Sequence, residues 1–191
     1  MKRYSMIDLT LHNNHKLVYT KVPEETGKEE FGMDNICILK SDLKMNKEEM
    51  FSNVNFKFNF GKYDNVVCNR QSILIGEFAT KVHIIGFAYW GDTNEYIKIV
   101  YEDGSEEFQK LTFVDWSHEA TNNFSGRYWH GNNVNTVKIV ISSGAMAHLI
   151  HFHHITCKCT KNQAIKEVVL PDNMFIHIFA MTLENENHTQ E

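Results

Sequence analysis

The sequence predicts an all-β domain in which short strands stack as a sandwich. Three observations predict it: apolar and polar side chains alternate over residues 54–60, an Asp103-Gly104 pair separates two strand-like segments, and no segment has a strong helical period. Strands that alternate with long helices would instead indicate a parallel sheet, and that pattern is absent. We therefore expect antiparallel strands in a sandwich or barrel.

The N-terminal part, residues 1–53, is less regular than the rest of the chain. Residues 20–30 are charged and predict a loop. Residues 41–50 give a weak helical signal, enough for a turn or two, with Ser41 or Asp42 as the cap. We expect this part to pack on the sandwich rather than to form a domain of its own.

Strand signals dominate from residue 54 onward. In the first predicted strand, residues 54–60, Val54 and three phenylalanines alternate with polar side chains, as in a strand with one buried face. Gly86 within a later strand predicts a bulge or a close approach of another backbone. The further predicted strands are residues 72–75, 82–89, 96–101, 106–114, 134–142, 149–157, 165–170 and 175–183.

The clearest local unit is a hairpin around Asp103-Gly104. Asp-Gly provides residues that tolerate the positive φ of a tight hairpin turn. Ile97, Ile99 and Tyr101 precede this turn at alternate positions, so we expect them to share one face of the strand.

Length and composition predict a single domain over residues 1–191, with its core at about 54–184 and a polar tail at 185–191. The net charge of −5 includes no basic stripe, which argues against a nucleic-acid partner. No apolar run is long enough to span a membrane, and the N-terminus lacks the apolar region of a signal peptide. We therefore expect a cytoplasmic protein without a membrane partner, in which the four cysteines are free thiols.

Five segments in this order resemble a known module: YDNVVC at 63–68, QSI at 71–73, VYEDGS at 100–105, VDW at 114–116 and LPDNMFIHIFAMTL at 170–183. They resemble the galactose-binding-like jelly-roll module that is attached to bacterial glycoside hydrolases, notably α-mannosidase-like proteins, and that also occurs in short stand-alone bacterial proteins. The resemblance covers about residues 54–184 and implies a jelly-roll β-sandwich that accompanies carbohydrate-active enzymes. We expect this chain to be one of the stand-alone examples, and the resemblance assigns no ligand residues.

Aromatic and polar residues in predicted loops suggest a ligand site. Saccharides are recognised by aromatic faces and by planar polar groups, and such convergent linings mark ligand sites generally. The candidate ligand-binding residues are Trp90, Asp92, Arg127, Trp129 and His130. Asp115-Trp116 is interpreted instead as a structural corner, in which the indole closes the core and the carboxylate bonds a turn.

A second cluster suggests a metal site. On a strand, His151, His153, Cys157 and Cys159 would point to the same face, and both residue types are good zinc ligands. Four ligands along one extended strand are spread over about 26 Å, so only neighbouring pairs could share an ion. A cupin site is also disfavoured, because Cys157 and Lys158 stand where its glutamate would be expected.

The sequence offers no nucleophile elbow, phosphate loop or dinucleotide fingerprint, and we expect neither a cofactor nor catalysis. Three hypotheses remain open. The first is a carbohydrate-binding-like module for a saccharide or small polar ligand. The second is an assembly protein that forms a homo-oligomer or docks on a partner enzyme, and the third is a metal-dependent enzyme that uses His151, His153 and Cys157.

Overall fold

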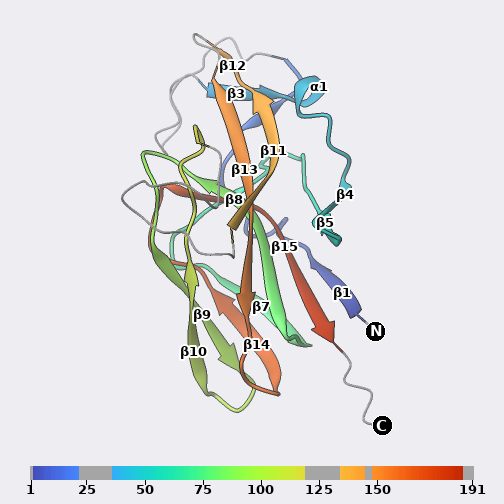
Figure 1. Cartoon of the computed structure of the whole chain (residues 1–191), viewed down its shortest axis with the longest axis vertical. Helices are drawn as coiled ribbons and strands as arrows, with labels where there is room; N and C mark the ends of the chain where they lie inside the picture. The colour runs from blue at the N-terminus through green and yellow to red at the C-terminus, as the bar shows by residue number, and fades with distance from the viewer. Residues whose placement is uncertain (1, 22–35, 119–133, 145–147, 187–191) are drawn as a thin grey trace.

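The computed structural model describes residues 2–21, 36–118, 134–144 and 148–186 of the chain. These residues form one short helix, α1 (Lys40–Leu43), and strands that fall into four sheets (Figure 1). The strands are β1 (Lys2–Ile7), β2 (Val18–Tyr19), β3 (Ile36–Leu39), β4 (Glu48–Phe51), β5 (Val54–Lys57), β6 (Val66–Val67), β7 (Ser72–Phe78), β8 (Lys81–Ala88), β9 (Glu95–Tyr101), β10 (Glu106–Leu111), β11 (Val134–Ile141), β12 (Ser143–Gly144), β13 (Leu149–Lys158), β14 (Ala164–Val169) and β15 (Ile176–Glu186).

Two antiparallel sheets make the body of the molecule. The six-stranded sheet has the order β1-β15-β8-β13-β11, with β6 also paired to β15, and the four-stranded sheet has the order β10-β9-β14-β7. Their facing surfaces enclose one apolar core, to which Ile84 and Met181 come from the first sheet and Ile99 and Val168 from the second. The predicted all-β sandwich is therefore confirmed.

The other face of the six-stranded sheet is buried as well. Along β8, Ile84 faces the four-stranded sheet while Ile85 faces the opposite way, where it packs with Phe56 in a second apolar cluster. This cluster joins the sheet to the N-terminal layer, which comprises residues 8–21 and 36–60 and includes β2, β3 and the hairpin β4-β5. The short strand β12, which follows β11, pairs with β3 at the edge of this layer. Figure 1 shows β3 and α1 at the upper end and β4 and β5 beside the large sheet. Because both faces are covered, β8, β13 and β15 are buried along most of their length.

Gly86 lies at a point where no side chain fits. A Cβ atom there would lie 2.3 Å from the backbone oxygen of His177 and 2.8 Å from the ring of Phe113. The predicted close approach at Gly86 is therefore confirmed. The irregularity of the ladder lies in the neighbouring strand β15, between Ile178 and Ala180.

The predicted hairpin is also confirmed. β9 and β10 pair with Val100 opposite Glu106, and Gly104 in the turn has a φ of 80°. Ile97, Ile99 and Tyr101 share the buried face of β9, as expected.

The N-terminal part departs from the sequence-based expectation. Helix α1 is a single turn with Leu39 as its N-cap and no side-chain cap, so the predicted capping by Ser41 or Asp42 is wrong. Residues 48–50, included in the weak helical signal, belong to strand β4 because they pair with β5. Residues 2–7 form β1 and pair along β15, which continues to Glu186. In the described parts of the chain, no helix has the length and apolar character needed to cross a membrane.

Candidate functional site

The loop between β8 and β9 presents Trp90 to solvent. Trp90 and Gly91 both have positive φ, 70° and 117°, so the chain reverses sharply as it leaves β8. A tryptophan rarely adopts this backbone conformation, because its Cβ crowds the backbone. The side chain is nevertheless 75% exposed, so burial of the indole does not offset the strain.

Asp115 holds this loop in place. Its Oδ2 accepts a hydrogen bond from Gly91 N at 2.5 Å, and its Oδ1 accepts one from Ser117 N at 2.9 Å. In return, Asp92 Oδ1 accepts a hydrogen bond from Asp115 N at 2.8 Å. The loop after β8 and the segment after β10 therefore fix each other through two carboxylates.

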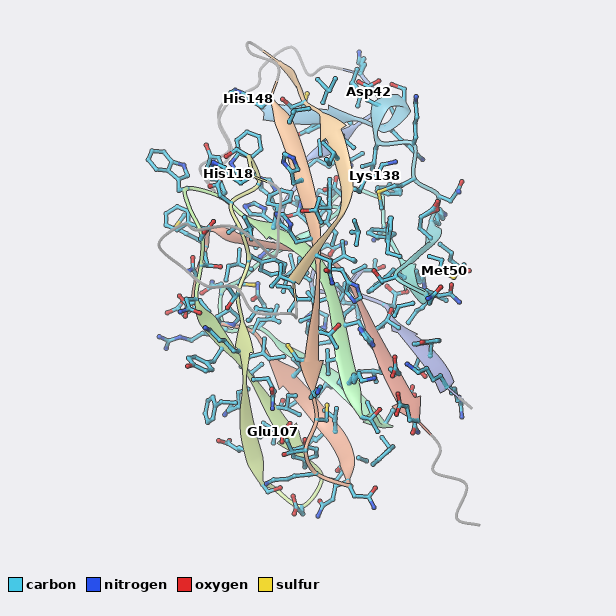
Figure 2. All side chains as sticks on the ribbon, viewed as in Figure 1. Asp42, Met50, Glu107, His118, Lys138 and His148 are labelled. Carbon is cyan, nitrogen blue, oxygen red and sulfur yellow. The ribbon has the colours of Figure 1, made fainter. Side chains whose placement is uncertain are left out.

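Trp116 lies beneath the loop and belongs to the second apolar cluster. Its ring packs against Tyr89 at 5.8 Å and against His148 at 5.4 Å between centroids, and Tyr89 contacts Trp90 edge-on. The interpretation of Asp115-Trp116 as a structural corner is confirmed. Figure 2 labels His118 and His148 in the upper half of the molecule.

Of the five candidate ligand residues, the structure brings Trp90 and Asp92 together on one loop. Trp90 offers a free aromatic face, whereas one oxygen of Asp92 is used to hold the loop. Arg127, Trp129 and His130 lie outside the described residues.

The histidines and cysteines proposed as metal ligands are engaged separately along β13. His151 Nδ1 lies 3.0 Å from Trp116 O, and His153 Nδ1 lies 3.2 Å from Thr136 Oγ1. Burial raises the thiol pKa of Cys157 and of Cys159 to about 12, so both thiols are protonated at neutral pH. Among residues 2–21, 36–118, 134–144 and 148–186, no three His, Cys, Asp or Glu side chains are grouped so as to hold a metal ion. The metal-enzyme hypothesis therefore has no ligand set in this part of the chain.

A buried polar chain crosses the face of the six-stranded sheet that the N-terminal layer covers. Glu184 on β15 contacts His83 on β8, with 3.2 Å between Oε2 and Nε2. His83 Nδ1 lies 3.0 Å from Nε2 of His154 on β13, and Nδ1 of His154 is buried without a hydrogen-bond partner among the described residues. We call these three residues the Glu184 chain.

Two lysines neutralise the carboxylate of this chain. Lys81 Nζ lies 2.5 Å and Lys2 Nζ 3.1 Å from Glu184 Oε1. Burial alone would raise the pKa of Glu184, but hydrogen bonds from both lysines lower it to about 2. Burial, and the neighbouring His83, lower the pKa of His154 to about 4, so His154 is neutral at pH 7.

The Glu184 chain could not be recognised in the sequence, because Glu184, His83 and His154 lie far apart there. The available signal was polar residues at alternate positions near strand ends, namely Lys81 and His83 on β8 and Thr182 and Glu184 on β15. Only the register of β15, β8 and β13 shows that the three members meet.

A second polar group ties the N-terminal layer to the sheet. His177 Nδ1 lies 3.0 Å from Asn65 Oδ1, and Asn65 Nδ2 lies 3.1 Å from His15 Nδ1. The buried carboxylate of Asp64 accepts hydrogen bonds from the backbone N–H groups of Leu17 and Val18. These bonds anchor the entry to β2, which places the group in a structural role.

The comparison with protein families agrees with this architecture. The model of a family described as the AziU2-like beta-sandwich domain matches residues 27–187. No curated protein matches the chain.

Proposed function

Because the chain belongs to the AziU2-like beta-sandwich domain family, whose description specifies a fold, we propose a function from the site alone: a non-catalytic module that holds a saccharide or a similar small polar ligand on the Trp90 loop. The observation that carries this proposal is an exposed tryptophan kept in a strained backbone conformation. The resemblance of residues 54–184 to galactose-binding-like modules supports the same ligand class.

The strain at Trp90 argues for a role beyond folding. A non-glycine residue at positive φ costs on the order of 1–3 kcal/mol, and such residues concentrate at ligand sites. Asparagine or glycine would fit this position with less strain. An indole there is best explained by a contact that it makes with a ligand.

The loop is also preorganised. Asp115 Oδ2 accepts a hydrogen bond from the backbone of Gly91, and Asp92 Oδ1 accepts one from the backbone of Asp115, so the loop is tied to the segment after β10. A ligand that stacks on the indole therefore has little loop entropy to overcome, which favours affinity. The exposed His118, whose Nδ1 lies 3.8 Å from Asp115 Oδ1, adds a polar group for ligand hydroxyls at the segment that holds the loop.

The test is a titration with galactose, mannose and a short mannose oligosaccharide, followed by NMR of backbone amides. We expect saturable shifts at residues 89–92 and weak, millimolar affinity. Trp90→Ala should lower the affinity about tenfold, since the ligand loses the apolar surface that it buries against the indole, at roughly 25 cal/mol per Å².

Phe108→Ala is the matched control, because Phe108 is 62% exposed on β10 and away from the loop. This control should bind as the unchanged protein does. Full binding by Trp90→Ala, with its fold intact in the amide spectrum, would exclude the loop as the site.

One observation favours a second candidate function, self-assembly through β11. Within the described residues β11 is an edge of the six-stranded sheet, and Ile139, Ile141 and the adjacent Leu149 are exposed there. A second copy could continue the sheet across this edge and cover these side chains. Light scattering should then report a dimer that Ile141→Lys converts to a monomer, and a monomer at all concentrations would rule this candidate out.

A further inference from the structure

A cleft of about 310 Å³ opens between the two large sheets at their β1 and β7 edges. Its lining combines polar side chains with an apolar floor. The lining residues are Arg3, Ser5, Glu77, Phe78, Leu183 and Asn185.

Side chains that point alternately to the two faces of β1 and β15 form the polar part of this lining. Arg3 lies opposite Asn185 and Ser5 opposite Leu183 in the antiparallel register. Successive side chains of a strand point to opposite faces, so these residues face the cleft while Lys2 and its neighbours face the Glu184 chain. The two strands thus carry one ionic cluster on one face and the cleft on the other.

The two walls of the cleft are fixed to each other. Ser5 Oγ on β1 donates a hydrogen bond to Glu77 Oε2 on β7 at 2.7 Å, which links the six-stranded sheet to the four-stranded sheet. Leu183 is buried and Phe78 half-buried, so the floor between these walls is apolar. The carboxylate of Glu77 is held at the opening with capacity to accept further hydrogen bonds.

Arg3 differs from the other cations of these strands. Lys2 and Lys81 both pair with Glu184, whereas the Arg3 side chain has no ion pair or hydrogen bond with any residue that the structure describes. A guanidinium has five N–H donors in a planar fork that matches a carboxylate. Beside it, the side-chain amide of Asn185 is also without a partner in the described part of the chain.

We propose that this cleft binds a small zwitterion of the amino-acid type. Arg3 and Asn185 receive its carboxylate, Glu77 receives its ammonium group, and its apolar part rests on Phe78 and Leu183. The volume is at the lower end of the range for small-molecule pockets, which suits a ligand of this size.

This site is separate from the Trp90 loop. Asn185 and Arg3 lie near Lys81, the first residue of β8, whereas Trp90 follows its last residue, Ala88. The two ends of an eight-residue strand are about 23 Å apart. Binding at one site can therefore be measured independently of the other.

L-leucine is the probe, compared with isocaproate and isoamylamine, each of which keeps its apolar group and one of its charges. Leucine should shift the amide resonances of β1, β7 and β15 saturably. Each half-ligand should bind about tenfold more weakly or worse, since a hydrogen bond to a charged group is worth about 1.5–3 kcal/mol.

Arg3→Gln and Glu77→Gln should each weaken leucine binding about tenfold or more for the same reason. Arg70→Gln removes an exposed arginine that pairs with Asp172 elsewhere, and it should leave binding unchanged. All three positions are exposed, so the amide spectrum should report a folded protein in each case.

The proposal is overturned if leucine produces no saturable shift at these strands. It is equally overturned if isocaproate binds as tightly as leucine or if Glu77→Gln leaves leucine binding unchanged, because the cleft would then recognise an anion alone.

Discussion

The two faces of the six-stranded sheet are buried in different ways. Toward the four-stranded sheet, the packed residues are almost all apolar, as with Ile84 and Met181. Toward the N-terminal layer, apolar side chains such as Ile85 and Phe56 share the interface with the Glu184 chain and with His15 and His177. The first face is closed mainly by hydrophobic burial, with the Ser5–Glu77 hydrogen bond at its edge, whereas the second combines burial with hydrogen bonds that are sensitive to protonation.

The largest expected effect is a loss of unfolding free energy, and it tests whether each face of the six-stranded sheet is tightly packed. Ile84 and Ile85 are adjacent on β8, both fully buried, and face opposite ways. Ile84→Ala and Ile85→Ala should each lower the free energy of unfolding by about 2–5 kcal/mol, because each leaves a cavity. Denaturant unfolding measures both. A cost below about 1 kcal/mol for Ile85→Ala alone would mean that the N-terminal layer is only loosely packed.

Acid should destabilise the protein through the face of the six-stranded sheet that the N-terminal layer covers, because that face buries neutral histidines. His154 has a pKa of about 4 in the folded protein against about 6.5 when unfolded, so between these values the unfolded state binds the extra proton. The stability that neutral His154 contributes is therefore complete above pH 6.5 and is lost as the pH falls toward 4, by about 3 kcal/mol in total. Burial likewise lowers the pKa of His177, which adds a loss of the same sign.

His154→Gln should make the dependence of unfolding free energy on pH shallower between pH 6.5 and 4. The charged groups nearest to His154, namely His83 and Glu184 with its lysines, remain in this variant. His118→Gln removes an exposed histidine and serves as the control, with an unchanged pH profile. Identical profiles for the two variants would contradict the assignment of acid sensitivity to the buried face.

A smaller effect is expected from the buried carboxylate. Glu184→Gln keeps the shape of the side chain but removes the anion beside His83 and leaves Lys2 and Lys81 paired with Glu186 alone, and we expect a loss of about 1–3 kcal/mol. Glu106→Gln removes an exposed carboxylate of the four-stranded sheet and should cost less than about 1 kcal/mol. Equal costs for the two changes would show that the Glu184 chain adds no more than a surface pair.

The smallest effect on stability is expected in the Trp90 loop, which lies outside both buried faces of the sheet. Trp90→Gly relieves the strain of a positive φ and removes an exposed indole, so the unfolding free energy should stay unchanged or rise by about 1 kcal/mol. Thermal unfolding checks this. A loss of more than about 1 kcal/mol would mean that the contact between Trp90 and Tyr89 is structural, which would weaken the case for a ligand.

The strands and the hairpin could be predicted because their signals are local. Alternation marked Val54 and Phe56 as buried, and Asp103-Gly104 fixed the turn before β10. The pairing of the strands could not be predicted from the sequence, since nothing near residue 2 indicates that Lys2 lies opposite Glu186.

The candidate site was predictable only in part. A loop tryptophan can be recognised in the sequence, but the exposure of Trp90 depends on how Asp115 holds the turn from 24 residues away. The cleft at Arg3 left no sequence signal, because its walls come from strands that are neighbours only after the two sheets stack. A site formed by one segment can thus be predicted from the sequence, whereas a site formed where separate strands pack together cannot.

The hairpin β4-β5 forms a sheet of its own and shares no ladder with the six-stranded sheet in the described residues. It is linked to β15 by a hydrogen bond from Thr182 Oγ1 to Asn55 O at 2.7 Å and to β13 by the packing of Phe56 on His154. Such a hairpin can be lengthened, shortened or exchanged without altering any strand register beneath it. Related chains would then be free to vary this element while keeping the same sandwich, and the surface it shields would change with it.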